Sequence, residues 1–520
     1  MKIFSVALSP HDHNTYDGVL HNQRERYTRL KHNVPYHFDS YPDDSLANRM
    51  NQNDESAGIK FYDEYFKPDE NEILAFTTTV GGFNQIKHNK IKKEFLEFYP
   101  KNLWDYKMVD NQYYIDHHQS HALYAFLTSG FKQSDILAID GRGWNFKCIF
   151  IDKNGSITDL SPKINIGQQW NYLSKKLGFG NLGAGKLMGL SAHGEYNLSL
   201  HFKIEQELYD FLEGLGWHAA NSGSVSHENI AATLQYHTIE LIHEHVLPLK
   251  SCDNICIAGG VAYNGYMNEE FTKYYNNVHV PPAPGDEGQS LGTYMHADFT
   301  LNKNIHIPNT YSGDEYDFNE GEAITPEEVG KAIANGNIVG WFNGKSESGN
   351  RALGNRSILA DPRNPKIKDI INRTIKHRED FRPFAPAVME EHYKTYFDTN
   401  QPSPFMSRIV PVKSNKIPGV THIDKTARIQ TVNAKQNEKF YRIIESFYKL
   451  TGIPMVLNTS FNCKEPIVET PEQAIKTFNK TALDVLVINN KEVRKWLKIY
   501  TKKGIRYTNI ARIYYLIKIK

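Results

Sequence analysis

Short apolar runs of strand length recur through the first three hundred residues of this chain, and helical stretches such as residues 230–248 separate them. The runs are Ile3–Leu8, Ile73–Thr79, Ile136–Ile139, Cys148–Asp152 and Ile255–Ala258. Strands that alternate with helices are typical of an α/β architecture, because the helices then cover the faces of a sheet. We therefore expect an α/β fold.

The chain is too long for one typical core, and its texture changes past the middle. It has 520 residues, and the segment from Leu301 to Thr325 is rich in Asn, Pro, Gly, Asp and Glu. A second α/β pattern follows, with a helix that begins at Pro326 and a strand-like run from Ile338 to Phe342. Because single cores stop growing at about 250–300 residues, we expect two domains, residues 1–310 and 311–520.

Composition excludes several classes of protein. No apolar run approaches the roughly 20 residues that cross a bilayer, and the start from Met1 to Ser9 indicates a first strand rather than a signal peptide. The four cysteines are too few and too scattered for a disulfide framework. We expect a cytoplasmic protein with no membrane partner, located in the host cytoplasm if the chain is viral.

Two histidines one helical turn apart give the strongest chemical signal. His117 and His121 are followed by Ala, Leu and Phe residues that predict a helix with both imidazoles on one face. Asp140 ends the run Ile136–Ile139, so a carboxylate stands at a strand tip, and Asp286 lies in a loop rich in Pro and Gly. A helical His pair also arises by chance, but the added acids favour a divalent ion beside a phosphate-bearing ligand.

Two glycine segments of the first domain are candidates for contact with a nucleotide. Gly180–Lys186 follows the P-loop pattern, but Leu187 stands where a Walker loop needs Ser or Thr to bind Mg²⁺, which argues against that fold. The segment Met188–Gly194 is expected to form a tight, ligand-facing turn rather than ordinary helix. In the second candidate a strand end runs into paired glycines, which also occur in plain turns, at Gly259, Gly260 and Asn264.

The second domain concentrates Arg and Lys among small and apolar residues. These cations accompany hydroxyl and amide side chains in the segments Asn350–Ser357, Lys376–Arg378, Phe381–Phe384, Thr426–Arg428 and Asn458–Asn462. Arg binds phosphates and planar carbonyl groups through two parallel hydrogen bonds, and Ser or Thr completes the remaining oxygens. The alternative is a solvated basic face, but the interleaved apolar residues favour an anion-binding site.

Positive charge is concentrated at one end of the chain. The formal net charge is +1, yet Lys491–Lys520 holds ten Lys or Arg residues and a single acid, Glu492. Two interpretations are open. The segment is either a solvated terminal helix and strand whose Trp496 packs inward, or a contact surface for a phosphate backbone.

These segments resemble the O-carbamoyltransferases related to nodulation-protein and antibiotic-biosynthesis carbamoyltransferases. The matching segments run in order across almost the whole chain, at Asp116–Ala122, Asp140–Gly143, Gly185–Leu190, Gly259–Asn264, Gly285–Gly288, Arg351–Arg363, Phe381–Pro386 and Leu457–Asn462. The run from Arg351 to Arg363 is highly specific, whereas each glycine segment alone is not. The family usually carries a Phe-Gly-Pro-like approach to that run, but Glu347–Asn350 stands there in this chain.

The resemblance implies an actin-like, sugar-kinase-type first domain and a YrdC-like second domain. It also implies two reactions. In the second domain, carbamoyl phosphate and ATP would form carbamoyl-adenylate with loss of phosphate and pyrophosphate, and in the first an acceptor hydroxyl would attack the carbamoyl carbonyl. A divalent metal, iron with magnesium or manganese as alternatives, would hold phosphate oxygens at His117, His121, Asp140 and Asp286.

The resemblance also implies roles for single residues. His11 would be the general base that accepts the hydroxyl proton, with His13 as its rival. The catalytic residues of the second domain would be Arg356, Lys376, Arg378, Arg428 and Ser460. The nucleotide would be bound by Lys186, Gly259, Gly260, Asn264, Arg351, Asn458 and Thr459.

No motif in the sequence identifies the acceptor hydroxyl. The basic tail, with the richness in Lys, Asn, Ile and Tyr that is typical of AT-rich genomes such as those of many phages, favours DNA that carries a hydroxymethyl-pyrimidine. A sugar or antibiotic-like small molecule is the alternative acceptor. Two other functions stay open: threonylcarbamoyl modification of tRNA, and a non-catalytic nucleotide-binding protein.

Overall fold

The computed structural model of the protein describes residues 1–8, 14–19, 21–23, 73–78, 98–141, 146–180, 183–198, 226–501 and 504–509. The predicted general base His11 and its rival His13 lie outside these residues. None of the described helices is long and apolar enough to cross a membrane.

The first sheet contains six strands in the order β3-β2-β1-β4-β6-β5. Its strands are β1 (Ile3–Leu8), β2 (Asn14–Tyr16), β3 (His21–Gln23), β4 (Ile73–Thr78), β5 (Lys107–Val109) and β6 (Gln112–Tyr114). β1, β2 and β3 pair antiparallel, whereas β4 runs parallel to β1 and β6 runs parallel to β4.

The second sheet repeats this plan. Its order is β11-β10-β7-β8-β9, and its strands are β7 (Asp135–Ile139), β8 (Cys148–Ile151), β9 (Ile157–Asp159), β10 (Asn254–Ala258) and β11 (Asn277–His279). β7, β8 and β9 pair antiparallel, whereas β10 is parallel to β7 and β11 is parallel to β10. The chain thus uses one sheet plan twice, which is the construction expected of an actin-like, sugar-kinase-type domain.

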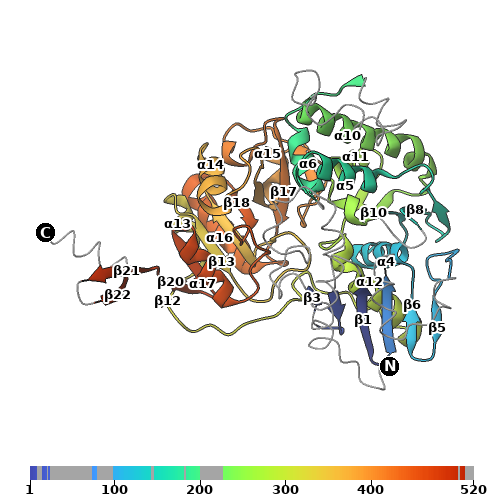
Figure 1. Ribbon diagram of the computed structural model, residues 1–520, viewed down its shortest axis with the longest axis horizontal. Helices are drawn as coiled ribbons and strands as arrows, with labels where there is room; N and C mark the ends of the chain where they lie inside the picture. The colour runs from blue at the N-terminus through green and yellow to red at the C-terminus, as the bar shows by residue number, and fades with distance from the viewer. Residues whose placement is uncertain are drawn as a thin grey trace.

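Two long helices fill the space between these sheets (Figure 1). α12 (Gln289–Asn302) packs on β1 and β4, α4 (His117–Ser129) packs on β7 and β10, and the two helices pack on each other. Residues from both sheets and both helices share one apolar cluster, which includes Ile3, Ala122 and Ala258. The core between the sheets therefore fixes where the first turn of each helix lies.

Four more helices surround a second apolar core of the second sheet. They are α5 (Ile166–Lys176), α6 (Ala184–Ser191), α10 (His227–Leu241) and α11 (Gly265–Phe271). α10 continues through a π-helical turn, η4 (Ile242–Val246), and a 3-10 turn, η5 (Leu247–Leu249). The prediction that Met188–Gly194 is a turn throughout was wrong, because Leu187, Met188 and Leu190 are buried against this core and extend α6 to Ser191.

The third sheet has nine strands in the order β12-β20-β19-β13-β14-β18-β15-β17-β16. They are β12 (Glu322–Ala323), β13 (Val339–Phe342), β14 (Arg356–Ala360), β15 (Ala385–Met389), β16 (Arg408–Pro411), β17 (Thr426–Val432), β18 (Met455–Ser460), β19 (Val485–Ile488) and β20 (Lys491–Val493). β14 pairs antiparallel with β18, with Ser357 opposite Ser460. This register brings the segments around Arg351 and Asn458 together.

Helices and short turns complete the second domain. α13 (Pro326–Ala334) packs on α16 (Glu438–Thr451), and α17 (Pro471–Lys480) packs on β13 and β19. The shorter elements are α14 (Ile367–Ile371), η8 (Asn372–Lys376), η9 (Glu390–His392), α15 (Tyr393–Tyr396) and η10 (Pro418–Val420). The α/β class of both parts is confirmed, and the division between α12 and β12 supports the domain bounds that we propose, residues 1–310 and 311–520.

The described part of the basic tail contains a strand hairpin. β21 (Trp496–Thr501) pairs antiparallel with β22 (Gly504–Asn509), and these strands form a sheet of their own. Figure 1 shows the hairpin standing away from the rest of the second domain. The tail residues beyond Asn509 lie outside the described part of the chain.

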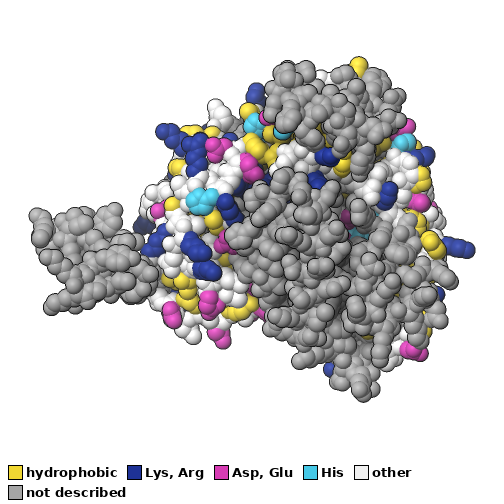
Figure 2. Space-filling model, viewed as in Figure 1, with side chains coloured by type: hydrophobic (Ala, Val, Ile, Leu, Met, Phe, Trp, Pro, Cys, Tyr) yellow, Lys and Arg dark blue, Asp and Glu magenta, His cyan; other side chains and the backbone are white. Residues whose placement is uncertain are grey.

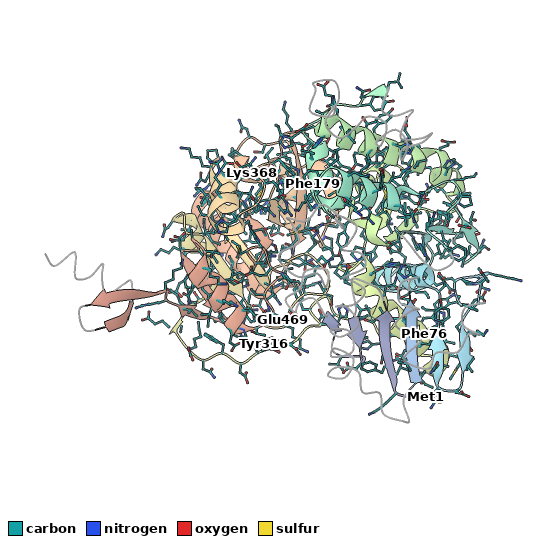
Figure 3. The ribbon with its side chains drawn as sticks, in the orientation of Figure 1. Met1, Phe76, Phe179, Tyr316, Lys368 and Glu469 are labelled. Carbon is teal, nitrogen blue, oxygen red and sulfur yellow. The ribbon has the colours of Figure 1, made fainter. Side chains whose placement is uncertain are left out.

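The two domains meet where β16 packs on α11. Arg408 of β16 is buried, and its Nη1 lies 3.3 Å from Oε2 of Glu269 on α11. The hydroxyl of Tyr266 donates to Asp424 Oδ2 at 2.6 Å, and the side-chain amide of Asn268 donates to the Ser407 carbonyl at 2.7 Å. Near this contact the ring of Phe179, labelled in Figure 3, meets that of Phe381 edge-on at 6.1 Å.

We expect Arg408→Ala to destabilise the protein, because Glu269 would stay largely buried without its cation. Loss of one partner of a buried ion pair costs about 3–5 kcal/mol, so the unfolding temperature measured by differential scanning fluorimetry should fall by several degrees. Arg442→Ala, which breaks the exposed pair with Glu327, is the control and should cost under about 1 kcal/mol. Equal shifts for the two variants would contradict a role of the Arg408 pair in joining the domains.

Candidate active site

The two histidines of the predicted metal site begin helix α4. Asp116 caps this helix, because its side chain accepts from the N–H of His118 at 2.8 Å and the side chain of Gln119 accepts from the N–H of Asp116 at 3.1 Å. This capping box places His117 and His121 one turn apart in the first turns of the helix. Both imidazoles are buried between the sheets.

The carboxylate of Asp140 is held at the end of β7 by a pair of glycines. The N–H of Gly260 donates to Asp140 Oδ2 at 2.8 Å. Gly259 has a φ of +89°, and a Cβ there would meet the carbonyl oxygen of Ile139 at 2.2 Å. Only glycine fits this close approach, so the paired glycines, predicted to contact a nucleotide, here position the strand-tip carboxylate.

Asp286 completes a cluster of four ligand groups. It begins the 3-10 helix η7 (Asp286–Gly288), and its Oδ1 lies 3.3 Å from Nε2 of His117 and 3.3 Å from Nε2 of His121. The same Nε2 of His121 lies 3.2 Å from Oδ2 of Asp140. One ligand atom from each of the four residues lies within 4.8 Å of the others.

The chemistry of this cluster fits a divalent cation. Burial alone would lower the pKa of His121, but hydrogen bonds to Asp140 and Asp286 outweigh it and raise the pKa to about 9. Burial and the charge of Asp286 work against ionisation of Asp140, and the hydrogen bond from His121 prevails and lowers its pKa. Two carboxylates and two imidazoles that converge in a buried space form a ligand set for a divalent ion.

A glutamine that the sequence prediction missed supports this cluster. The side-chain amide nitrogen of Gln289 lies 3.1 Å from Nδ1 of His117 and donates to the carbonyl oxygen of the same residue at 3.1 Å. Such partners of a ligating imidazole set its orientation. Gln289 lies three residues after Asp286, at the start of α12, and this spacing was the only available signal. The neighbouring His118 is buried, and burial lowers the pKa of its imidazole to about 3.

Two partly buried guanidinium groups lie at the domain boundary. Arg351 stands over the ring of Tyr263, 5.0 Å from its centroid, and Nη2 of Arg428 lies 3.8 Å from the sulfur of Met188. Burial lowers the pKa of both groups, and the charge of Arg351 lowers that of Arg428 further. Among the residues that the structure describes, neither guanidinium has a carboxylate within 4.0 Å. Two partly buried cations with no described carboxylate within 4.0 Å favour an anionic ligand.

Lys376 and Arg378 flank a strained residue. The π-helical turn η8 ends at Lys376, and His377 follows with a φ of +46°. Nζ of Lys376 is buried and lies 2.6 Å from Oδ1 of Asn462 and 3.2 Å from Oγ of Ser460. Nε of Arg378 donates to the side chain of Asn372 at 2.7 Å. A π-helical turn with a left-handed residue after it is common at functional sites.

Several predicted residues are engaged in contacts within the fold. Nη1 of Arg356 donates to the carbonyl oxygens of Asn343, Gly344 and Asn355 at 2.9–3.1 Å. The side chain of Asn458 donates to the Ala352 carbonyl at 3.0 Å and to Gln430 at 2.8 Å. The amide oxygen of Asn264 caps α11, and Thr459 pairs with Ile358 across β14 and β18. Ligand roles for these residues stay predictions.

Lys186 reaches across the domain boundary. Its Nζ lies 3.2 Å from Oε1 of Glu379, and Nη1 of Arg382 lies 3.7 Å from the other oxygen of the same carboxylate. Arg382 is partly buried, with 27% of its side chain exposed, and its pKa falls mainly through burial. Lys186 of the first domain and Arg382 of the second domain therefore approach the same carboxylate. The sequence prediction had assigned no role to Glu379.

The segment Glu347–Asn350, where this chain departs from the family pattern just before Arg351, has a structural role. Oε1 of Glu347 accepts backbone N–H donors of Leu353 at 2.5 Å and of Asn355 and Arg356 at 3.3 Å each. The Glu347 carboxylate is buried. It therefore organises the loop that carries Arg351, in place of the Phe-Gly-Pro-like segment that the resemblance predicted.

We expect one divalent ion per chain in the purified protein. His121→Ala and Asp286→Asn each remove a ligand from the cluster, so metal content measured by inductively coupled plasma mass spectrometry should fall from about one ion to less than about 0.1, in line with the loss of a charged or imidazole ligand. His243→Ala alters a partly exposed histidine and should keep the ion. A parent protein that binds no divalent ion after incubation with Fe²⁺, Mn²⁺ or Mg²⁺ would rule out the site.

Comparison with known proteins places the chain in a family. Residues 23–220 and 202–295 match the family model described as the carbamoyltransferase N-terminus, and residues 330–495 match the one described as the carbamoyltransferase C-terminus. The nodulation protein NolNO of Sinorhizobium fredii is 34% identical over 440 residues, which span 74% of this chain and 64% of that relative. The nodulation protein NolO of Bradyrhizobium diazoefficiens is 32% identical over 435 residues, 73% of this chain and 79% of that relative.

The solved structures that resemble this fold are more distant. The activator of 2-hydroxyisocaproyl-CoA dehydratase from Clostridium difficile, with bound ADPNP, aligns with 58% of this chain and 97% of its own, at 14% identity and a TM-score of 0.34. We draw no conclusion about this chain from a TM-score this low. The matches to both family models, with 32% identity to NolO over most of its length, show that the chain belongs to the carbamoyltransferase family.

Proposed function

We propose that the protein is an ATP-dependent O-carbamoyltransferase that works through carbamoyl-adenylate. The observation that carries this proposal is the pair of partly buried guanidinium groups, Arg351 and Arg428, beside the N-terminal domain that holds the ligand cluster. A phosphate group bound between them would lie at the boundary of the two domains. An intermediate made in one domain and consumed in the other needs such a shared site.

The first reaction belongs to the second domain. Carbamoyl phosphate loses phosphate to water and gives carbamate, whose oxygen attacks the α-phosphorus of ATP and displaces pyrophosphate. Lys376, with Ser460 and Asn462, offers a buried ammonium group and polar oxygens to the reacting phosphates. Arg351, Arg378 and Arg428 would neutralise the charge that the phosphates bring.

The second reaction belongs to the first domain. The oxygen of an acceptor hydroxyl attacks the carbamoyl carbon, the bond to AMP breaks, and the hydroxyl proton passes to a base, for which we propose His11. His117, His121, Asp140 and Asp286 would hold a divalent metal, iron or else magnesium or manganese, that neutralises charge on the phosphate. Gly260 and Gln289 keep two of these ligands in place.

If each reaction takes place in its own domain, variants of the two domains should lose different activities. His121→Ala should abolish carbamoyl transfer while carbamoyl-phosphate-dependent release of pyrophosphate from ATP continues. Lys376→Met should lower pyrophosphate release by at least about 100-fold, because an ammonium group is lost from the phosphates. Lys449→Ala alters an exposed lysine and should leave both activities intact.

The outcome of these assays also separates the rival functions. Pyrophosphate release that requires bicarbonate and threonine instead of carbamoyl phosphate would indicate tRNA threonylcarbamoyl chemistry. Loss of both activities in His121→Ala would contradict the division between the domains. No turnover with any donor would indicate a non-catalytic nucleotide-binding protein.

We propose DNA that carries a hydroxymethyl-pyrimidine as the acceptor, with a sugar or antibiotic-like hydroxyl as the alternative. On the face in Figure 2, the described Lys and Arg side chains lie among Asp and Glu. The concentration of positive charge that supports a DNA acceptor is therefore the tail, Lys491–Lys520, with the projecting hairpin at its start. A primary alcohol on a base can attack the carbamoyl carbon as described above.

Binding of duplex DNA through the tail should weaken steeply with salt. Each neutralised phosphate lowers log K by about 0.9 per unit of log salt concentration. Lys502→Ala/Lys503→Ala, at two residues outside the described part of the chain, should flatten the slope measured by fluorescence anisotropy by about 1–2 units and leave pyrophosphate release intact. Salt-independent or undetectable binding by the parent would return the acceptor to small molecules.

A further inference from the structure

One hydrogen bond joins the two short helices that support the carboxylates of the ligand cluster. The 3-10 helix η6 (Gly260–Tyr263) begins at Gly260, whose N–H holds Asp140, and η7 begins at Asp286. Tyr263, the last residue of η6, donates its hydroxyl hydrogen to Oε1 of Glu287, the residue that follows Asp286. This bond therefore cross-links the supports of both carboxylates.

The same tyrosine faces the second domain. Its ring lies under the guanidinium of Arg351, and its hydroxyl oxygen lies 3.5 Å from the backbone nitrogen of Asn350, which donates to it. The loop also approaches the first domain closely at Gly349, where φ is +92° and a Cβ would meet the carbonyl oxygen of Pro282 at 2.3 Å. The loop that carries Arg351 is thus seated on Tyr263 and on the segment before η7.

A chain of interactions therefore runs from the ligand cluster to the guanidinium pair. Asp286 and Glu287 are consecutive residues, Glu287 bonds Tyr263, and Tyr263 supports Arg351, whose charge acts on Arg428. No described carboxylate lies within 4.0 Å of Arg351, although the charge of Glu287 acts on it, so the ring of Tyr263 is a direct support of its guanidinium. A shift of η7 relative to η6 would move that support.

We propose that Tyr263 is a positioning residue that couples occupancy of the metal centre to binding of a phosphate group at Arg351 and Arg428. The inference rests on the proposed function, because it needs both a cation at the ligand cluster and a phosphate at the guanidinium pair. A cation bound by Asp140 and Asp286 orders η6 and η7 and keeps the ring of Tyr263 in place. A phosphate that binds afterwards then costs less conformational entropy, because this region is already ordered, so it binds more tightly.

Isothermal titration calorimetry of AMP with and without saturating Mn²⁺ tests this coupling. AMP offers a single phosphate, and His117→Ala measures any effect of Mn²⁺ on AMP that does not pass through the ligand cluster. We expect Mn²⁺ to tighten AMP binding to the parent by about tenfold, within the usual range of coupling between sites. By reciprocity, AMP should tighten binding of Mn²⁺ by the same factor.

Tyr263→Phe separates positioning from simple packing. The variant keeps the ring under Arg351 and loses the hydroxyl with its bond to Glu287 and its long 3.5 Å contact from Asn350, so AMP affinity without metal should change less than about twofold, and the gain from Mn²⁺ should also fall below about twofold. Tyr441→Phe is the matched control, because it loses a tyrosine–carboxylate bond, to Glu391, that lies within the second domain and outside this chain of contacts. It should keep the tenfold gain.

The possible results distinguish this inference from the proposed function. A full gain in Tyr263→Phe, or equal losses in Tyr263→Phe and Tyr441→Phe, would overturn the role of Tyr263. Binding of both Mn²⁺ and AMP by the parent without any coupling would also overturn it, while leaving the proposed function in place. A parent that binds neither probe would contradict both.

Discussion

The structure of this protein depends on the burial of two carboxylates beside two imidazoles between two sheets. Asp140 and Asp286 come from different segments of the chain, and His117 and His121 come from a third. Local backbone structure holds each of these side chains. A capping box at the start of α4 holds the histidines, the paired glycines near the end of β7 hold Asp140, and a 3-10 turn before α12 holds Asp286. Such a grouping is costly to bury without a cation, which is why we propose that these four side chains hold one.

The same principle applies to the domain boundary, with the charges reversed. Arg351 and Arg428 are partly buried, and the charge of the first acts on the second, whereas Arg408 is buried with its partner Glu269. The paired arginine joins the domains, because its charge is compensated by the protein. Neither Arg351 nor Arg428 has a described carboxylate within 4.0 Å, which favours the anion that we propose to bind there.

Part of the site could be predicted from sequence because its signals are local. The spacing of His117 and His121 predicted one helix face, and the apolar run before Asp140 predicted a strand tip, as the structure has them. Gln289, Tyr263 and Glu287 were missed because each acts through a partner that is distant in sequence. Met188–Ser191 was mistaken for a turn because its glycine suggested one, although burial of its apolar side chains stabilises a helix.

The sequence by itself determined the α/β class, the family and the residue types available for metal and phosphate chemistry, because periodicity and short motifs record local requirements of the backbone. Only the tertiary structure decided which of these residues meet. The repeated sheet plan left no repeat that was visible in the sequence, since strand order depends on pairing between distant segments. Likewise, Arg356 and Arg351 stand five residues apart in one motif, yet carbonyl oxygens surround the first and a tyrosine from the other domain supports the second. Their different surroundings arise from packing across the sheets and between the domains, which no local pattern encodes.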